Sequence, residues 1–315
     1  MAVRLETTSR RSIYEALAPQ PVTQLTIVDS GRSPIIRALT EKDIKTHDLR
    51  ISVYETREQG GLAAALRLLR ILSMYSEAFY TNSVLLAADS THLSVYSQII
   101  KHAKAFNVDL GSIHWGHLDN YAYPQSEYPN GPDTYDFVTH LRRHFIDPAQ
   151  IPDDHFHPIV SWGTDNLSQV AIDYDAWVRN VQPVIGLFGL GPVTPAHMKS
   201  STVPDEVHLA YITAQTPLKV GYHYLPELSQ ATIYRNRVMR GETSPTGGIT
   251  MGPRNIQQLQ FKLVSAWGKP QEVAAAFLGP INLGTVATML RRHNYRRRTH
   301  IFLDRASAQP LLERV

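Results

Sequence analysis

The sequence predicts an α/β fold, with one domain built on a mostly parallel sheet and helices on both faces. Segments of strand and helix character alternate along the chain, which is typical of parallel strands joined by helices. The 315 residues are 43% hydrophobic, enough for a sizeable core, and no internal repeat or low-complexity linker divides them. We therefore expect an N-terminal extension over residues 1–50 and one domain over residues 51–315.

The elements expected in the first half of the chain follow from local patterns. Residues 25–30 (LTIVDS) indicate a short strand inside the extension. Leucine and alanine recur at three- and four-residue spacing in residues 61–79, which predicts an amphipathic helix. Residues 84–88 indicate a buried strand, and apolar side chains at helical spacing follow it. We expect a strand running into a loop in residues 111–123 and a third helix in residues 133–146.

The second half of the chain repeats this alternation. Residues 171–182 predict a helix that leads into an apolar strand at residues 184–188. Residues 206–213 alternate between polar and apolar side chains, which predicts an exposed strand. Residues 262–279 indicate a strand, a Gly-Lys-Pro turn and a helix, and residues 300–307 indicate a last buried strand.

Composition restricts the environment and the partners of the chain. The absence of cysteine excludes disulfides, thiolate catalysis and cysteine-ligated metals. The N-terminus lacks an apolar core of signal-peptide length, and no apolar run approaches the roughly 18 residues of a membrane span. We expect a soluble, cytoplasmic protein without a membrane partner. The basic run Arg291–His300 is interpreted as solvated rather than as a nucleic-acid contact, because aromatic interleaving and a second basic stripe are missing.

Ligands bind beyond the carboxyl ends of strands in a parallel α/β sheet, and the first such place here is the turn Asp89–Thr91. Ser90 and Thr91 can offer hydroxyls and helix N-terminal amides to a phosphate, whereas Asp89 would repel an anion. An ordinary helix cap explains the same residues equally well. These residues alone therefore leave both interpretations open.

The second place is the segment His114–Pro124, which follows the next strand. Asp119 can act there as a general base on a carbon-bound proton. His114 and His117 can in principle bind a metal, but their spacing of three suits neither strand face and no third ligand is assured. We therefore expect no metal site.

The third and fourth places are the glycine turn Gly189–Gly191 and the turn at Lys269. Consecutive amides of the glycine turn can approach a ligand closely. Thr194 and His197 are the nearby polar groups with catalytic potential, although a lone histidine is more often a surface residue. Lys269 follows a strand and can contact a phosphate; a solvated turn lysine is the alternative.

The order of these segments resembles the glucosamine-6-phosphate isomerase/deaminase and 6-phosphogluconolactonase family. The stretch DSTHLSVYSQII resembles the family's phosphate turn and helix, with Asp89 for the usual glycine and His92 for the usual proline. The stretch HLDNYAYP is similar to the family's aspartate-glutamate-tyrosine motif, with Asn120 at the glutamate position. The likeness covers about Glu55–Ser307 and implies a sheet related to the Rossmann type.

The sequence departs from the family pattern in the glycine loop. The stretch VIGLFGLGPVTPAH stands where the family carries G-x-G-x-D-G-H. Gly189 and Gly191 match, whereas Val193 and Pro195 occupy the aspartate and histidine positions that sugar ring opening would use. His197 lies two residues farther on and is the candidate replacement.

The resemblance implies a glucosamine-6-phosphate isomerase/deaminase-like protein that acts on or binds a sugar phosphate, with a degenerate ring-opening motif. The alternatives are a non-catalytic sugar-phosphate sensor and a 6-phosphogluconolactonase, the latter disfavoured by the missing histidine. No cofactor is implied, and a homo-oligomer is compatible with the fold. The residues predicted to form the site are Asp119 and His197 as catalytic groups and Ser90, Thr91, Gly189, Gly191, Thr194 and Lys269 as substrate-binding groups.

Overall fold

The structure of the chain is a computed structural model. It describes residues 17–29, 34–38, 49–76, 83–132, 136–198, 207–212, 216–241, 244–281, 285–292, 295 and 298–315.

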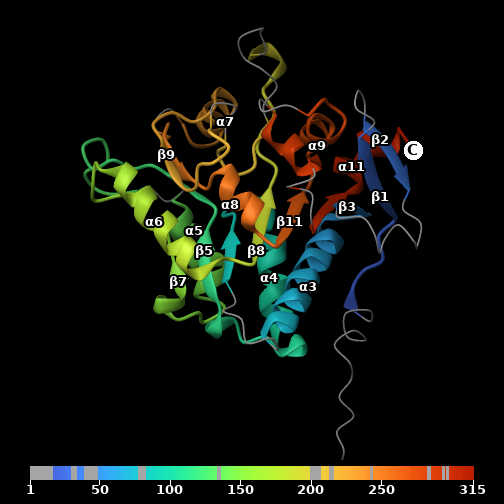
Figure 1. Cartoon of the computed structure of the whole chain (residues 1–315), viewed down its shortest axis with the longest axis horizontal. Coiled ribbons are helices and arrows are strands. Elements are labelled where there is room, and N and C mark those ends of the chain that lie inside the picture. The colour runs from blue at the N-terminus through green and yellow to red at the C-terminus, as the bar shows by residue number, and fades with distance from the viewer. Residues whose placement is uncertain are drawn as a thin grey trace, which may run out of the picture.

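The described residues form a nine-stranded sheet in the order β2-β1-β3-β12-β11-β8-β4-β5-β7, which crosses the molecule from right to left in Figure 1. All strands from β3 to β7 in this order pair in parallel. The extension contributes β1 and β2, which pair antiparallel at one edge. The strands are β1 Thr23–Asp29, β2 Pro34–Ala38, β3 Leu49–Tyr54, β4 Ser83–Leu86, β5 His114–His117, β7 Phe156–His157, β8 Ile185–Gly189, β11 Phe261–Ala266 and β12 Thr299–Asp304.

Helices cover both faces of this sheet, because successive strand side chains point to opposite faces and both sets are apolar. In β4, Val84 and Leu86 belong to one core cluster and Leu85 to the other. The cluster around Val84 is completed by α3 (Arg57–Ser76), α4 (Leu93–His102) and α5 (Phe137–Leu141). The cluster around Leu85 is completed by α6 (Leu167–Val181), α8 (Pro253–Gln258), α9 (Pro270–Phe277) and α11 (Arg305–Leu312). The predicted α/β fold is therefore confirmed.

A second, three-stranded antiparallel sheet lies beyond the carboxyl end of β5. It consists of β6 (Asp119–Tyr121), β10 (Gly248–Thr250) and β9 (His223–Leu225). Leu118 joins the two sheets, because its amide donates to Leu86 in the main sheet and its carbonyl accepts from Met251. The chain therefore leaves the main sheet at Leu118, and Asp119 begins the small sheet just beyond the carboxyl end of β5.

The predicted exposed strand over residues 206–213 is wrong for the residues the structure describes, 207–212. They form turns, and Val207, His208 and Leu209 are all buried in succession. Their backbone carbonyls accept hydrogen bonds from the loop after β8 and from the 3₁₀ helix Val286–Arg291, since the Gly191 amide donates to His208 and the Ala287 amide donates to Val207. Consecutive side chains are thus buried together, and the described part of this segment pairs with no strand.

The other predicted elements are found with shifted ends. The helix expected over residues 133–146 begins at Phe137 and continues beyond Leu141 as a π-helical turn, Arg142–Ile146. The Gly-Lys-Pro turn forms with Gly268 at a φ of +62°, a value that favours glycine, and Pro270 then starts α9. Within the described part of the chain, no helix has the length and apolar character needed to cross a membrane.

Candidate functional site

A cavity of about 310 Å³ opens at the carboxyl ends of β4 and β8, where a parallel α/β sheet binds its ligands. The first residue of β6 and the helix α7 (Gln230–Arg240) form its other walls. The lining includes Ala87, Ala88, Asp89, Ser90, Leu118, Asp119, Tyr121, Phe137, His140, Gly189, Leu190, Gly191, Pro192, Ala210, Tyr211, Thr232, Arg235, Asn236 and Met239.

Asp119 lines this cavity as a buried carboxyl, with 7% of the residue exposed. Within the described residues, its side chain makes no hydrogen bond or ion pair. Burial, and then the negative charge of Asp89, raise the pKa of Asp119 to about 8. The group therefore holds a proton at neutral pH and can exchange it close to pH 8.

The turn after β4 is organised around the Asp89 carboxylate. Asp89 Oδ1 accepts hydrogen bonds from the Thr91 amide at 3.1 Å and from His92 Nδ1 at 2.8 Å. Asp89 Oδ2 accepts from the Thr91 hydroxyl at 2.7 Å. His92 Nε2 lies 3.1 Å from the Phe188 carbonyl, so both ring nitrogens face acceptor oxygens.

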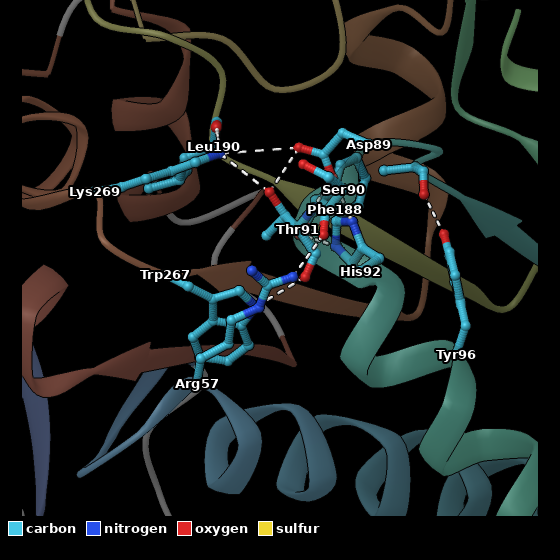
Figure 2. Close-up of polar contacts among 11 residues, drawn as sticks. Arg57, Asp89, Ser90, Thr91, His92, Tyr96, Phe188, Leu190, Trp267 and Lys269 are labelled. Carbon is cyan, nitrogen blue, oxygen red and sulfur yellow. Dashed lines mark hydrogen bonds and ion pairs between the residues drawn. The ribbon is translucent and has the colours of Figure 1, made fainter. Parts of the chain in front are cut away.

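Lys269 completes this charged cluster from the turn after β11 (Figure 2). Its ammonium donates to the Leu190 carbonyl at 2.6 Å and to the Thr91 hydroxyl at 3.4 Å, and it lies 3.9 Å from Asp89 Oδ2. Burial alone would raise the pKa of Asp89, but the hydrogen bond and charge of His92 and the charge of Lys269 hold it well below its usual range. Asp89 is therefore ionised at any physiological pH.

The Ser90 and Thr91 carbonyls of the predicted phosphate turn each accept a hydrogen bond from a side chain of another element. Arg57 Nη2 donates to the Ser90 carbonyl at 2.7 Å, and Trp267 Nε1 donates to the Thr91 carbonyl at 2.9 Å (Figure 2). Ser90 lines the cavity, whereas Thr91 and Lys269 lie behind Asp89 and outside the lining. The turn is thus fixed on both sides before any ligand binds.

Gly189 and Gly191 both line the cavity, and each permits a close backbone approach. A Cβ on Gly189 would lie 3.3 Å from Asp89 Oδ2. A Cβ on Gly191 would lie 2.9 Å from the His208 Cβ, closer than side chains allow. The Gly191 amide donates to the His208 carbonyl at 2.9 Å, so this amide is not offered to a ligand.

Thr194 and His197 lie away from the cavity lining. Thr194 is buried, with 1% exposed. His197 is exposed in a 3₁₀ turn, Ala196–Met198, and its ring packs against Tyr234 with centroids 5.2 Å apart. The structure therefore brings Ser90, Asp119 and the two glycines together at the cavity, and does not bring these two side chains there.

One wall of the cavity, the polar face of α7, was missed by sequence reasoning. Asn236 Oδ1 accepts from the Tyr121 hydroxyl at 3.0 Å, while its buried Nδ2 has no hydrogen-bond partner among the residues that the structure describes. Arg235 also lines the cavity and makes no hydrogen bond or ion pair with the part of the chain that the structure describes. The signal lay in the spacing of Thr232, Arg235, Asn236 and Met239, which places them on one helix face.

The histidines weighed as metal ligands occupy separate environments. His114 Nδ1 lies 3.0 Å from His157 Nε2, whereas His117 is fully buried beside Phe156. Burial lowers the pKa of His117 to about 3, so its ring is neutral. Within the described residues, no group of three or more histidine, aspartate or glutamate side chains is placed to hold a metal ion.

Comparison with solved structures identifies the fold. The chain aligns with a monomeric glucosamine-6-phosphate deaminase of the NagB superfamily at a TM-score of 0.68 and 19% identity, over 82% of this chain and 98% of the deaminase. It aligns with the 6-phosphogluconolactonase from Trypanosoma brucei at a TM-score of 0.58 and 18% identity, over 83% and 98% of the two chains. The chain has the deaminase–lactonase fold. The Trypanosoma cruzi lactonase agrees, at a TM-score of 0.58 and 16% identity over 82% and 95%.

The comparisons confirm the resemblance seen in the sequence at the level of the fold. No family model and no curated protein matches the chain. Because the identities to these solved structures are below 20%, the chain is a divergent example of the deaminase–lactonase fold. Its activity has to be argued from its own site.

Proposed function

We propose that the chain binds a sugar, phosphorylated or free, in the cavity at the carboxyl ends of β4 and β8, and that Asp119 transfers a proton on it. The observation that carries this proposal is the buried Asp119 carboxyl, which has no hydrogen-bond partner in the described part of the chain and whose pKa is raised to about 8 within the cavity. A group of that pKa both accepts and returns a proton near neutral pH. The deaminase–lactonase fold supports a sugar as the ligand by analogy.

The reaction that fits is an aldose–ketose isomerisation of the kind associated with sugar-phosphate deaminases. Ionised Asp119 would take the proton from the carbon next to the sugar carbonyl and return it to the carbonyl carbon, while a proton passes from the oxygen or nitrogen on the first carbon to the carbonyl oxygen. With an amino sugar this gives an imine, and its hydrolysis by water releases ammonia. Asn236 Nδ2 and Arg235 would bind hydroxyl or anionic groups of the sugar from α7. Because Asp119 must first lose its own proton, we expect turnover to rise as pH approaches 8.

Binding without turnover is the second candidate, and one observation favours it. His197, the candidate for ring opening, is exposed and packs on Tyr234 outside the cavity lining. Val193 and Pro195 supply no acid or base in the same loop. A sensor needs the cavity but not this chemistry. A 6-phosphogluconolactonase has less support, since it too would use the missing histidine.

Titration calorimetry and an ammonia-release assay test the proposal. Wild-type protein is titrated with glucosamine-6-phosphate, fructose-6-phosphate, 6-phosphogluconate, glucosamine and fructose. Asp119→Asn should bind the preferred sugar and lose turnover, whereas the exposed Asp173→Asn on α6 should behave as wild type. Binding without turnover in the wild type would select the sensor. If no sugar binds the wild type, the proposed function is wrong.

A further inference from the structure

The anion-binding groups at one end of the cavity already hold an anion. We call the Thr91 amide and hydroxyl, the His92 imidazole and the Lys269 ammonium the anion cradle. The Asp89 carboxylate receives hydrogen bonds from Thr91 and His92 at 2.7–3.1 Å and lies 3.9 Å from the Lys269 ammonium. Figure 2 shows Lys269 and Thr91 converging on this one carboxylate. Three hydrogen-bond donors and one ammonium group therefore converge on a group that belongs to the chain itself.

Little of the cradle is left for a ligand phosphate. The Lys269 ammonium is also bound to the Leu190 carbonyl at 2.6 Å, and His92 is bound on its far side to the Phe188 carbonyl at 3.1 Å. The Gly189 backbone closes over the carboxylate, since a Cβ there would lie only 3.3 Å from Asp89 Oδ2. A phosphate could reach these donors only by displacing Asp89, an ionised group that is tied to the same turn.

Asp89 nevertheless remains in contact with the cavity. Its side chain keeps 31% of its surface exposed and forms part of the cavity lining. Asp119 is the second acid in the lining, and the two charges interact unfavourably when both are ionised. A ligand group at this end therefore meets a carboxylate that accepts hydrogen bonds, rather than a ring of donors.

We propose that Asp89 is a built-in substitute for a ligand phosphate: it fills the anion cradle and makes the site select sugars that present hydroxyl groups there. This inference rests on the proposed function for the identity of the ligand as a sugar. The occupation of the cradle by Asp89 is carried by the contacts alone. The predicted contact of Ser90, Thr91 and Lys269 with a sugar phosphate is replaced by a contact of Asp89 with sugar hydroxyls.

Chemical rescue tests the occupation of the cradle. Asp89→Gly empties it, and Asp89→Asn keeps its shape without the charge. Thermal unfolding of both variants and of the wild type is followed in inorganic phosphate, with sodium chloride at equal ionic strength as the control. We expect phosphate at about ten times its dissociation constant to raise the Tm of Asp89→Gly by roughly 2–5 °C, and to leave the other two unchanged.

Either of two results of the thermal unfolding experiment would overturn the inference. One is a wild-type Tm that rises with phosphate as much as that of Asp89→Gly, and the other is an Asp89→Gly Tm that does not respond. If Asp89→Gly does not fold, calorimetry on the wild type decides. If the wild type binds phosphate and Lys269→Gln abolishes this binding, the inference is overturned. If the wild type binds a free sugar but no phosphate, the inference is supported.

Sugar selectivity separates this inference from the proposed function. Wild-type protein should bind glucosamine at least as tightly as glucosamine-6-phosphate, and Asp89→Gly should shift this preference roughly tenfold toward the phosphate. A wild type that prefers glucosamine-6-phosphate tenfold would contradict the inference and leave the proposed function standing. A wild type that binds no sugar, with Asp89→Gly still rescued by phosphate, would contradict the proposed function and the sugar selection that rests on it, and would leave the occupation of the cradle by Asp89 standing.

Discussion

The two polar walls of the cavity differ in how their groups are satisfied. At the β4 turn, Asp89 is bonded to Thr91 and His92 and lies beside the Lys269 ammonium. At the α7 wall and the start of β6, neither the buried Asn236 Nδ2 nor the Asp119 carboxyl has a hydrogen-bond partner among the described residues. A ligand gains most from groups that folding has left unpaired, because their desolvation is already complete. We therefore expect the chemistry and most of the binding free energy on the α7 side, and structural stability together with the selection among sugars on the β4 side.

The largest expected effect concerns the pH dependence of stability. The pKa of Asp119 is about 8 in the folded chain, against an ordinary value of 3.8. Between these values the folded carboxyl keeps a proton that the unfolded one has lost, so this contribution to stability is full below pH 4 and falls as pH rises to 8. The slope is at most about 1.4 kcal/mol per pH unit and flattens near pH 8, which gives a loss of roughly 3.5 kcal/mol between pH 5 and pH 8.

Urea unfolding of wild type and Asp119→Asn at pH 5, 6, 7 and 8 measures this contribution. The variant lacks the titrating carboxyl, so its stability should fall less steeply with pH, while all other groups titrate alike in both proteins. Asp173→Asn should follow the wild type. Parallel curves for wild type and Asp119→Asn would show that Asp119 does not sit unpaired in the cavity.

The next effect is expected at the β4 wall. Lys269→Met removes the ammonium that bonds the Leu190 carbonyl at 2.6 Å and lies 3.9 Å from Asp89. We expect a loss of about 2 kcal/mol in the free energy of unfolding. This is less than for a fully buried pair, since Asp89 keeps 31% of its side chain exposed and retains its bond to His92.

Denaturant unfolding at pH 7 provides the measurement for Lys269→Met, with the exposed Lys101→Met on α4 as the control. The control should stay within about 0.5 kcal/mol of wild type. A loss below that size for Lys269→Met would mean that the cluster does not stabilise the fold. The contrast between the two walls would then disappear.

A smaller and different effect is expected at the α7 wall. Asn236→Ala removes an acceptor for the Tyr121 hydroxyl, which lies 3.0 Å away, and should cost about 1 kcal/mol of stability. Because Nδ2 is free to bind a ligand, sugar affinity should fall roughly tenfold. Gln230→Ala, exposed on the same helix, should change neither quantity. Unchanged affinity of Asn236→Ala would place recognition elsewhere.

Most of the fold could be predicted because its signals are local. Buried strands such as residues 84–88 are apolar runs followed by capping residues, and the helix over residues 61–79 has clear periodicity. The failure at residues 206–213 has a tertiary cause. Alternation there reflects packing of Val207 and Leu209 against the end of the sheet, and strand pairing is decided by neighbours that the pattern does not contain.

The candidate site could be predicted only in part, for a similar reason. Asp119, Ser90 and the two glycines follow strands directly, so the rule that ligands bind at strand carboxyl ends locates them. Arg235 and Asn236 come from α7, which reaches the cavity through the tertiary arrangement. The role of Asp89 could not be predicted, because a carboxylate beside two hydroxyls also fits a helix cap. The anion cradle proposed for Asp89 depends on the position of Lys269, which only the tertiary structure gives.

The smallest effect is expected for a substitution of His197. It tests whether the groups that line the cavity in the structure are sufficient, or whether His197 joins them when a ligand binds. His197 is exposed and packs on Tyr234 outside the lining. Replacement by alanine should therefore change sugar affinity and turnover less than twofold, within the range of surface substitutions. Calorimetry and the ammonia-release assay, with Asp119→Asn as the inactive reference, measure both quantities. A tenfold loss of turnover with unchanged affinity would mean that ligand binding reorganises the Gly191–Pro195 loop and brings His197 in. The missing ring-opening group would then be supplied by movement of the loop.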